Sequence, residues 1–340
     1  MLHLALGLDI KYVMQCGVAI SSVCENNKGE EVFFHILVLA EKSELNHFSD
    51  LVDIVKGYNQ KYEIIAIGEA YFEKLPQISY ISKATYLRLL LPQVISPNID
   101  QLLYLDSDIV VLGSLHYFVE NPLRDDIACG AAIDVNGCSI KHHNRLGISS
   151  SVTYFNAGIL QMNLKYWRKH NISDQTINKV SENQYWFMDQ DAINVVLSGK
   201  IHRIPFKYNL QTSHYLYLPI EQELDIVYHQ ELLEAMDKPV IIHYASYRKP
   251  WFDDCPKREY WEYYFKKTKW ANEPLLCTPP NDDTTQEWLH RIRSKDNRLL
   301  NKYAPTFYKM LYWASRSKLS RITFKCAFKF LSLFLHLFGF

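Results

Sequence analysis

Two aspartates one residue apart follow an apolar run, and they are the clearest chemical feature of this 340-residue sequence. Asp106 and Asp108 come directly after Leu102-Leu-Tyr-Leu105, a run typical of a buried strand. Where such a strand opens into a loop, two carboxylates at i and i+2 can turn toward one cation. Mg²⁺ and Mn²⁺ prefer oxygen-rich shells and also bridge to phosphate oxygens. The pattern Asp-x-Asp is common by chance, so its position after a strand is what favours a metal site.

A histidine ends a second apolar run late in the chain. His243 closes Val240-Ile-Ile-His243, and Lys249 and Trp251 follow it closely. A lone histidine at a strand end is usually a structural residue, so two interpretations of His243 stay open: a structural role and a functional one. Lys249 is suited to contact a phosphate, with Trp251 packed in the same loop.

Two further polar groups have a structural alternative beside the functional one. Asp189-Gln190-Asp191 begins an apolar helix, where aspartate is also a common N-cap. Asn156 lies among apolar neighbours in Tyr154-Phe-Asn-Ala-Gly158 and is equally compatible with a buried turn. The sequence contains no Gly-x-Gly-x-x-Gly, no P-loop and no Gly-x-Ser-x-Gly, which argues against dehydrogenases, P-loop enzymes and α/β-hydrolases.

Strand-like runs alternate with helical patterns through the first half of the chain. The alternation predicts parallel strands with right-handed crossovers in a Rossmann-like α/β layer, whose ligands bind beyond the carboxyl ends of the strands. The predicted strands are 2–8, 32–39, 62–67, 102–105, 127–133, 155–162 and 239–243, and the predicted helices are 13–24, 43–57, 83–91 and 189–198. Helix 83–91 is expected to end before Pro92, and the polar segment 135–153 is predicted to be a mobile substrate loop.

The C-terminal region is basic, whereas the rest of the chain is acidic. The formal net charge is zero, yet no acidic residue follows Asp296, which leaves 29 basic residues against 37 acidic ones in the remainder. The eight basic residues after Asp296 are Arg298, Lys302, Lys309, Arg316, Lys318, Arg321, Lys325 and Lys329. We predict a linker at 271–300 and a basic amphipathic tail at 301–340 that binds an anionic membrane surface.

Two alternatives exist for this tail. It could pack on the domain as an ordinary C-terminal helix with a solvated basic face, or it could bind nucleic acid. The acidic body and the apolar end of the tail argue against nucleic acid, so no nucleic-acid partner is expected. Lys329 and His336 interrupt the last apolar stretch, so its uninterrupted length is well below the roughly 20 residues that a membrane span needs. The seven scattered cysteines, with no Cys-x-x-Cys, predict a cytoplasmic protein with reduced thiols.

Several of these segments together, in this order, resemble glycosyltransferase family 8, and within it the bacterial lipopolysaccharide core glucosyl- and galactosyltransferases. The resemblance covers about residues 2–265. Its motifs are Leu6-Gly-Leu-Asp9, Thr85-Tyr-Leu-Arg88-Leu, Leu103-Tyr-Leu-Asp106-Ser-Asp108, Tyr154-Phe-Asn156-Ala-Gly158, Asp189-Gln190-Asp191 and His243-Tyr244 with Lys249-Pro250-Trp251.

This resemblance implies a single GT-A catalytic domain at 1–270, a UDP-hexose donor and Mn²⁺ or Mg²⁺. It implies retaining, α-linked transfer of glucose or galactose to a lipid-linked oligosaccharide of the lipopolysaccharide core, at the cytoplasmic face of the inner membrane. The implied metal ligands are Asp106, Asp108 and His243. The implied donor contacts are Asp9 at the uridine, Lys249 at the diphosphate, and Arg88, Asn156, Asp189 and Gln190 at the sugar, while Asp134 faces the acceptor.

The sequence departs from the family pattern at two places. Ala245-Ser246 follows the His-Tyr pair where a glycine is common, and Ile10-Lys11 follows Asp9 where acidic or amide residues are common. Other functions compatible with the motifs are a catalytically silent sugar-binding or scaffold relative and a transferase acting on another glycan or a protein. A self-glycosylating protein is disfavoured because the tail resembles a membrane anchor.

Overall fold

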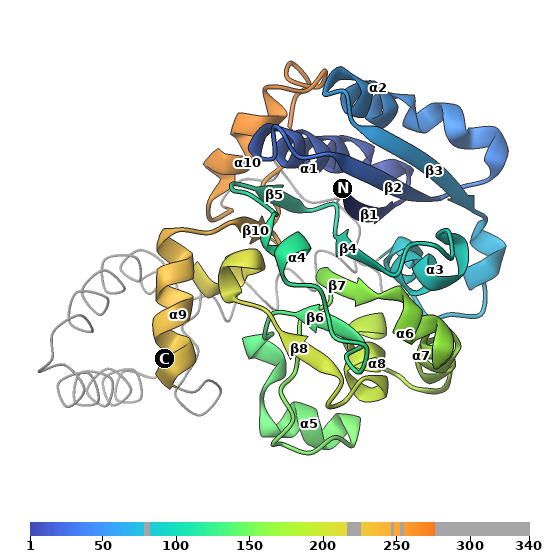
Figure 1. Cartoon of the computed structure of the whole chain (residues 1–340), viewed down its shortest axis with the longest axis vertical. Coiled ribbons are helices and arrows are strands. Elements are labelled where there is room, and N and C mark those ends of the chain that lie inside the picture. The colour runs from blue at the N-terminus through green and yellow to red at the C-terminus, as the bar shows by residue number, and fades with distance from the viewer. Residues whose placement is uncertain (78–81, 216–225, 246–247, 252–254, 276–340) are drawn as a thin grey trace, which may run out of the picture.

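A twisted mixed β-sheet forms the centre of the part of the chain that the computed structural model describes, which is residues 1–77, 82–215, 226–245, 248–251 and 255–275 (Figure 1). Its seven strands lie in the order β3-β2-β1-β4-β7-β6-β8. They are β1 (Leu2–Leu8), β2 (Val32–Leu39), β3 (Lys61–Ile67), β4 (Gln101–Leu105), β6 (Cys129–Ala131), β7 (Ile159–Asn163) and β8 (Ile201–Arg203). The first four are parallel, and β7 runs antiparallel to both β4 and β6.

Helices cover both faces of this sheet because the side chains of each strand alternate between the faces. In β1, one face of the strand packs with α1 (Val13–Asn26) and α2 (Ser49–Gly57) through Leu2, Leu4, Leu6 and Leu8. Ala5, on the other face, packs on the side of α3 (Leu87–Val94). The α3 face also carries α6 (Leu164–Lys169), α7 (Ile172–Glu182) and α8 (Met188–Val196). The remaining helices are α4 (Tyr117–Glu120), α5 (Ile140–Leu146), α9 (Ile226–Asp237) and α10 (Arg258–Phe265), the last of which packs against α1.

A second, three-stranded sheet brings distant parts of the chain to the end of β4. β10 (Ile241–His243) lies between β5 (Ile109–Val111) and β9 (Leu210–Gln211). It runs antiparallel to β5, with His243 opposite Ile109, and parallel to β9. The Asp106–Asp108 turn connects β4 to β5, so this pairing places His243 beside both aspartates.

The predicted α/β architecture and the strands of the first half are confirmed, while the type or bounds of several elements differ from the prediction. Segment 43–57 is a 3₁₀-helix (Lys42–Phe48) followed by α2. α3 continues through Pro92 to Val94, because this proline removes one backbone donor only in the last turn of a helix held by buried leucines. Strands 127–133 and 155–162 are shorter or shifted, as β6 and β7, with an isolated bridge between Ile133 and Phe155.

Segment 135–153 contains a short 3₁₀-helix (Val135–Gly137) and α5, and its role as a mobile substrate loop stays a prediction. The Oγ atom of Ser139 accepts a hydrogen bond from the N–H of His142 and caps the start of α5. Gly147, at φ 68°, takes the left-handed conformation that ends it. Both signals are present in the sequence but are masked by the polar composition of the segment.

The linker and tail predictions fall almost entirely on residues 276–340, which lie outside the described residues, so they stay predictions. Within the described ranges, no helix combines the length and the apolar character needed to cross a bilayer.

Candidate active site

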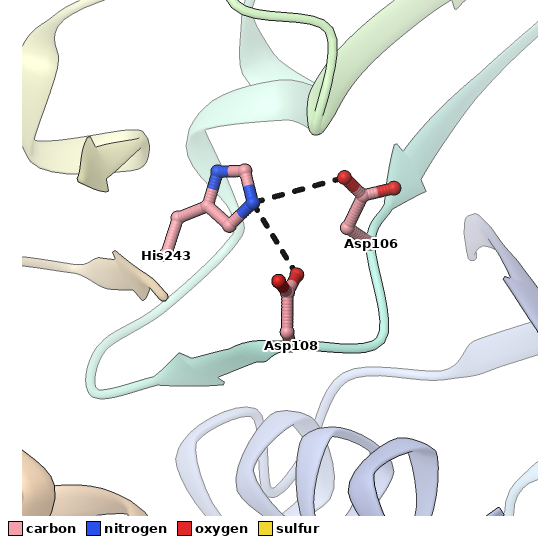
Figure 2. A group of neighbouring side chains, drawn as sticks. All are labelled: Asp106, Asp108 and His243. Atoms are coloured by element: carbon pink, nitrogen blue, oxygen red, sulfur yellow. Dashed lines mark ion pairs between the residues drawn. The ribbon is translucent and has the colours of Figure 1, made fainter. Parts of the chain in front are cut away.

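Two carboxylates and an imidazole converge at the carboxyl end of β4 (Figure 2). The Nε2 atom of His243 lies 3.3 Å from Oδ1 of Asp108 and 3.7 Å from Oδ2 of Asp106. One ligand atom from each of the three residues falls within 4.8 Å of the others, and no other such group of His, Cys, Asp or Glu occurs among the described residues. Two carboxylate oxygens and one imidazole nitrogen form a donor set that suits Mn²⁺ or Mg²⁺.

The hydrogen bonds behind His243 leave its Nε2 atom free to bind a cation. Nδ1 of His243 lies 3.0 Å from Oδ1 of Asn209, whose Nδ2 donates to Oδ1 of Asn156 at 2.9 Å. Asn156 Oδ1 also accepts the N–H of Gly158, which fixes it as an acceptor and so fixes the orientation of Asn209. The proton of a neutral His243 therefore lies on Nδ1, and the lone pair on Nε2 is directed at the aspartates.

Gly158 provides the close approach that this cluster needs. A Cβ atom at this position would lie 2.1 Å from Cε1 of His243 and 2.8 Å from Oδ2 of Asp106. The carbonyl of Gly158 accepts the N–H of Asp106 at 2.8 Å, so the start of β7 also fixes the aspartate turn. Any side chain here would occupy the space of the two ligand groups.

Arg88 links the aspartate pair to the start of α8. Its Nη2 lies 3.0 Å from Oδ1 of Asp106, and its Nε lies 3.0 Å from Oδ2 of Asp189. The Tyr104 hydroxyl also donates to Asp106 at 2.7 Å, and the Thr85 hydroxyl donates to Asp189 at 2.8 Å. Burial raises the pKa of both carboxyl groups, while Arg88 acts in the opposite direction by favouring their charged forms. The guanidinium thus compensates two buried acids at once.

Lys249 places a second cation at the site. Its Nζ lies 2.5 Å from Oδ2 of Asp108 and donates to the carbonyl of Tyr244 at 2.7 Å. Burial opposes both charges, yet Asp108 raises the pKa of Lys249, and Lys249 together with His243 lowers the pKa of Asp108. The lysine is therefore charged, and it is available to an anionic group that binds beside the metal ligands.

A network of amides lies on the other side of Asn156. Oε1 of Gln190 accepts from Nδ2 of Asn156 at 3.1 Å and from the N–H of Ala157 at 3.0 Å. Nε2 of Gln190 donates to Oδ2 of Asp134 at 3.0 Å and to the Tyr154 hydroxyl at 3.2 Å. Asp134, Asn156 and Gln190 are thus held together next to the cluster of Asp106, Asp108 and His243.

The structure brings nearly all of the sequence-predicted site residues into one connected set of polar contacts. This set of contacts has two parts. The first consists of Lys249, Asp108, His243, Asn156, Gln190 and Asp134, and the second consists of Asp106, Arg88 and Asp189. Asp9 stands apart at the end of β1, where its Oδ1 accepts the N–H of Lys11 at 2.9 Å. The N-cap of α8 is Phe187, so neither Asp189 nor Asp191 serves as the N-cap.

Sequence reasoning missed three polar residues of this site, namely Asn209, Tyr104 and Tyr154. Tyr104 and Tyr154 lie inside the quoted motifs, but their alternation in strand-like runs favours a core role. Asn209 precedes a strand of only two residues and carries no local signal. Its role follows only from the pairing of β9 with β10.

An α/β fold with an Asp-x-Asp turn at a strand end is typical of GT-A type glycosyltransferases, and solved structures described below share this fold. Residues 3–255 match the model of the family described as Glycosyl transferase family 8. The chain belongs to this family.

Individual relatives agree with this assignment. The chain is 26% identical over 296 residues to a lipopolysaccharide 1,2-glucosyltransferase of Escherichia coli, covering 85% of each chain. It is 26% identical over 284 residues to a lipopolysaccharide 1,3-galactosyltransferase of Salmonella typhimurium, covering 81% of this chain and 80% of the relative.

Two solved structures of the galactosyltransferase LgtC also match. One, in complex with donor and acceptor sugar analogues, has a TM-score of 0.68 and 26% identity and covers 85% of this chain and 99% of that chain. The other is an active-site mutant with glutamate in place of glutamine, with a TM-score of 0.69 and 25% identity over the same shares of the two chains.

Proposed function

We propose that this enzyme transfers glucose or galactose from a UDP-sugar to a saccharide acceptor of the lipopolysaccharide core, with Mn²⁺ or Mg²⁺ and with retention of configuration. The observation that carries the proposal is the cluster of Asp106, Asp108 and His243, with Lys249 beside it, in a member of glycosyltransferase family 8. The names of the lipopolysaccharide glucosyl- and galactosyltransferase relatives support the acceptor class.

The metal ligands and Lys249 form the diphosphate end of the proposed site. Oxygens of Asp106 and Asp108 and Nε2 of His243 would hold the ion, together with donor diphosphate oxygens. The bound ion supplies neutralisation of the negative charge that develops on the departing UDP. Lys249 binds the same diphosphate with its ammonium group, and Asp9 contacts the uridine.

The opposite end of the site binds the sugars. Arg88, Asp189, Asn156 and Gln190 orient the donor hexose, and Asp134 faces the acceptor. Gln190 would lie at the reacting face, and a structure of LgtC with an active-site glutamine replaced by glutamate supports a role for a glutamine in sites of this kind. An amide is a poor nucleophile, and both ends of this one already form hydrogen bonds within the protein.

These contacts favour a displacement on one face of the sugar over a covalent glycosyl-enzyme. The acceptor oxygen forms the new bond to the anomeric carbon on the face from which UDP departs. The bond between that carbon and the diphosphate oxygen breaks, and a diphosphate oxygen takes the acceptor proton. Trapping of a covalent adduct on Asp189 or Gln190 in a single turnover would contradict this mechanism.

The proposal includes the division of the chain into a catalytic domain (1–270), a linker (271–300) and a membrane-associating tail (301–340). The tail would hold the enzyme on the cytoplasmic face of the inner membrane, where a lipid-linked acceptor is accessible. The basic and apolar faces of its predicted helix support this placement.

The experiment that tests the function combines the purified chain with UDP-glucose or UDP-galactose, Mn²⁺, and defined truncated core oligosaccharides. Mass spectrometry detects a gain of one hexose, and NMR of the product gives the anomeric configuration. A chain that binds UDP-sugar but neither hydrolyses nor transfers it would be a silent sugar-binding relative, which would overturn the proposal. Transfer only to another glycan or to protein would overturn the acceptor class alone.

A further inference from the structure

A buried carboxylate lies directly behind the amide network and has no place in the proposed site so far. Asp191 follows Gln190 in α8, and its side chain has no exposed surface. Both of its oxygens accept hydrogen bonds. Oδ1 accepts from the Tyr154 hydroxyl at 2.6 Å and pairs with Nε2 of His142 at 2.9 Å, and Oδ2 accepts from Nη2 of Arg145 at 2.7 Å and from the N–H groups of Trp186 at 2.9 Å and Phe187 at 3.1 Å.

Tyr154 connects this carboxylate to the Gln190 amide. A tyrosine hydroxyl has one proton, and a carboxylate can only accept, so the proton of Tyr154 is directed at Asp191. The hydroxyl oxygen is then left as an acceptor, and it faces Nε2 of Gln190 at 3.2 Å. Had the Tyr154 proton pointed the other way, it would favour the carbonyl end of Gln190 at this position.

The remaining contacts of Gln190 require the same orientation. Asp134 can only accept at the nitrogen end, and the N–H of Ala157 can only donate at the oxygen end. The amide therefore has one orientation that satisfies all its partners, and Tyr154 contributes one of the two contacts that hold the nitrogen end.

We infer that Asp191 and Tyr154 are positioning residues for the transfer reaction: Asp191 orients the Tyr154 hydroxyl, and that hydroxyl orients the Gln190 amide. The inference rests on the proposed function, in which Gln190 lies at the reacting face. Neither side chain touches substrate, because Tyr154 and Asp191 are both 0% exposed. They act through Gln190, and the five hydrogen bonds that Asp191 accepts also make it unsuited to attack the donor.

A purely structural role is the alternative, because Asp191 also holds α5 through His142 and Arg145. Tyr154→Phe separates the two roles, since it removes only the hydroxyl. Nε2 of Gln190 keeps its contact with Asp134, and Oδ1 of Asp191 keeps its contact with His142, so no buried group is left without a partner. Arg145→Gln is the matched control, because it weakens the contact with α5 and leaves Tyr154 in place.

The experiment measures kcat and both KM values for Mn²⁺-supported transfer, from whichever of UDP-glucose and UDP-galactose the wild-type chain uses. Tyr154→Phe is expected to lower kcat about tenfold, with both KM values within about twofold of wild type, because one orienting hydrogen bond is lost. Asp191→Asn is expected to change kcat in the same direction, and Arg145→Gln to keep kcat near wild type. In a Gln190→Ala background, Tyr154→Phe should cause no further loss in single-turnover rate, because both changes act through the same amide.

Three outcomes would overturn the inference. A Tyr154→Phe variant with wild-type kcat would show that the hydroxyl does not matter for transfer. Losses that multiply in the Gln190→Ala background, or an equal loss in Arg145→Gln, would assign the effect to packing of α5. If the wild-type chain transfers no hexose, the proposed function itself fails and the inference fails with it, whereas an active wild type with an unaffected Tyr154→Phe variant overturns the inference alone.

Discussion

The ammonium of Lys249 lies 2.5 Å from Oδ2 of Asp108, the carboxylate whose other oxygen faces His243. A proposed metal ligand is thus already paired with a basic side chain of the protein. Arg88 does the same for Asp106 at 3.0 Å. The half-buried carboxylates of Asp106 and Asp108 would repel each other, and these basic partners allow them to stay close together. The protein's own side chains therefore hold the two carboxylates in this arrangement.

Replacing either Asp106 or Asp108 tests the proposed metal ligands. Asp106→Asn or Asp108→Asn is expected to lower Mn²⁺-dependent transfer by about a hundredfold or more, because an amide binds a divalent ion much more weakly than a carboxylate. Transfer rates over a Mn²⁺ titration measure the loss, and circular dichroism checks the fold. Asp125→Asn, at an exposed aspartate with a 3.6 Å pair to Lys165, is the control. Near-normal rates in either variant would show that the metal site is assigned wrongly.

Lys249 is expected to contribute mainly to donor binding. Lys249→Met removes the ammonium that faces the diphosphate, so the Kd for UDP in the presence of Mn²⁺ should rise about tenfold or more. Isothermal titration calorimetry measures this change. Lys249→Arg keeps the charge and should recover part of the affinity, while Lys207→Met, at an exposed lysine elsewhere, should have no effect. An unchanged UDP affinity in Lys249→Met would exclude a diphosphate contact.

The sequence predicts those parts of the fold that local residue patterns indicate. β1, β2 and β4 are continuous apolar runs, and the Asp106–Asp108 turn follows directly from the end of β4. The short strands β5 and β9 have no such signal, because three residues in β5 and two in β9 are too few to show an alternating pattern. They exist because β10 pairs with both of them.

Local sequence patterns also explain which site residues the sequence predicts. Asp106 and His243 stand at the ends of visible strands, and Arg88 lies in a family motif. Asn209 and Asp191 act only through contacts between segments that are distant in the chain. For the run Asp189-Gln190-Asp191, the sequence leaves N-capping open as a structural alternative, because aspartate is a preferred N-cap residue. The role of Asp191 behind the amide network is shown only by the Tyr154 hydroxyl, which contacts both Asp191 and Gln190.

The pH dependence of stability can be tested at Glu25, which connects α1 to its neighbours. Its carboxylate lies 2.9 Å from Nζ of Lys267 and accepts from the Tyr58 hydroxyl at 2.8 Å. Lys267 first, and then Tyr58, lower the pKa of Glu25 to about 2. A lowered pKa in the folded state contributes stability above the unfolded pKa, about 4.3, and this contribution is lost as the pH falls toward 2.

Glu25→Gln should therefore lower the urea midpoint at pH 7 and lower it clearly less near pH 2.5, where the carboxylate begins to be protonated in the folded state. The expected change at pH 7 is modest, since the contact lies near the surface. Equilibrium unfolding at both pH values measures it, with Glu73→Gln at an exposed position as the control. A difference between wild type and Glu25→Gln that is the same at both pH values would contradict the assigned contacts.

The predicted tail can be tested by deleting residues 305–340. The truncated chain should bind vesicles of anionic phospholipid much less than the full chain, because it lacks the predicted basic and apolar faces. Transfer to a soluble acceptor should change little, since the described site lies within residues 1–275. Co-sedimentation with anionic and with neutral vesicles measures binding. A truncated chain that co-sediments like the full chain would refute the membrane-binding role of the tail.

Gly158 offers the sharpest steric test of the site. Gly158→Ala adds a Cβ atom that would lie 2.1 Å from Cε1 of His243, so the imidazole must move away from Asp106 and Asp108. Mn²⁺ affinity in the presence of UDP is expected to fall by about tenfold or more, because one ligand is displaced. Calorimetric titration of Mn²⁺ measures the change. Gly57→Ala adds the same methyl group where no heavy atom lies within 4 Å, and it should bind Mn²⁺ like the wild type. If both variants bind Mn²⁺ equally well, His243 does not ligate the ion, and the cluster at the end of β4 is not the metal site.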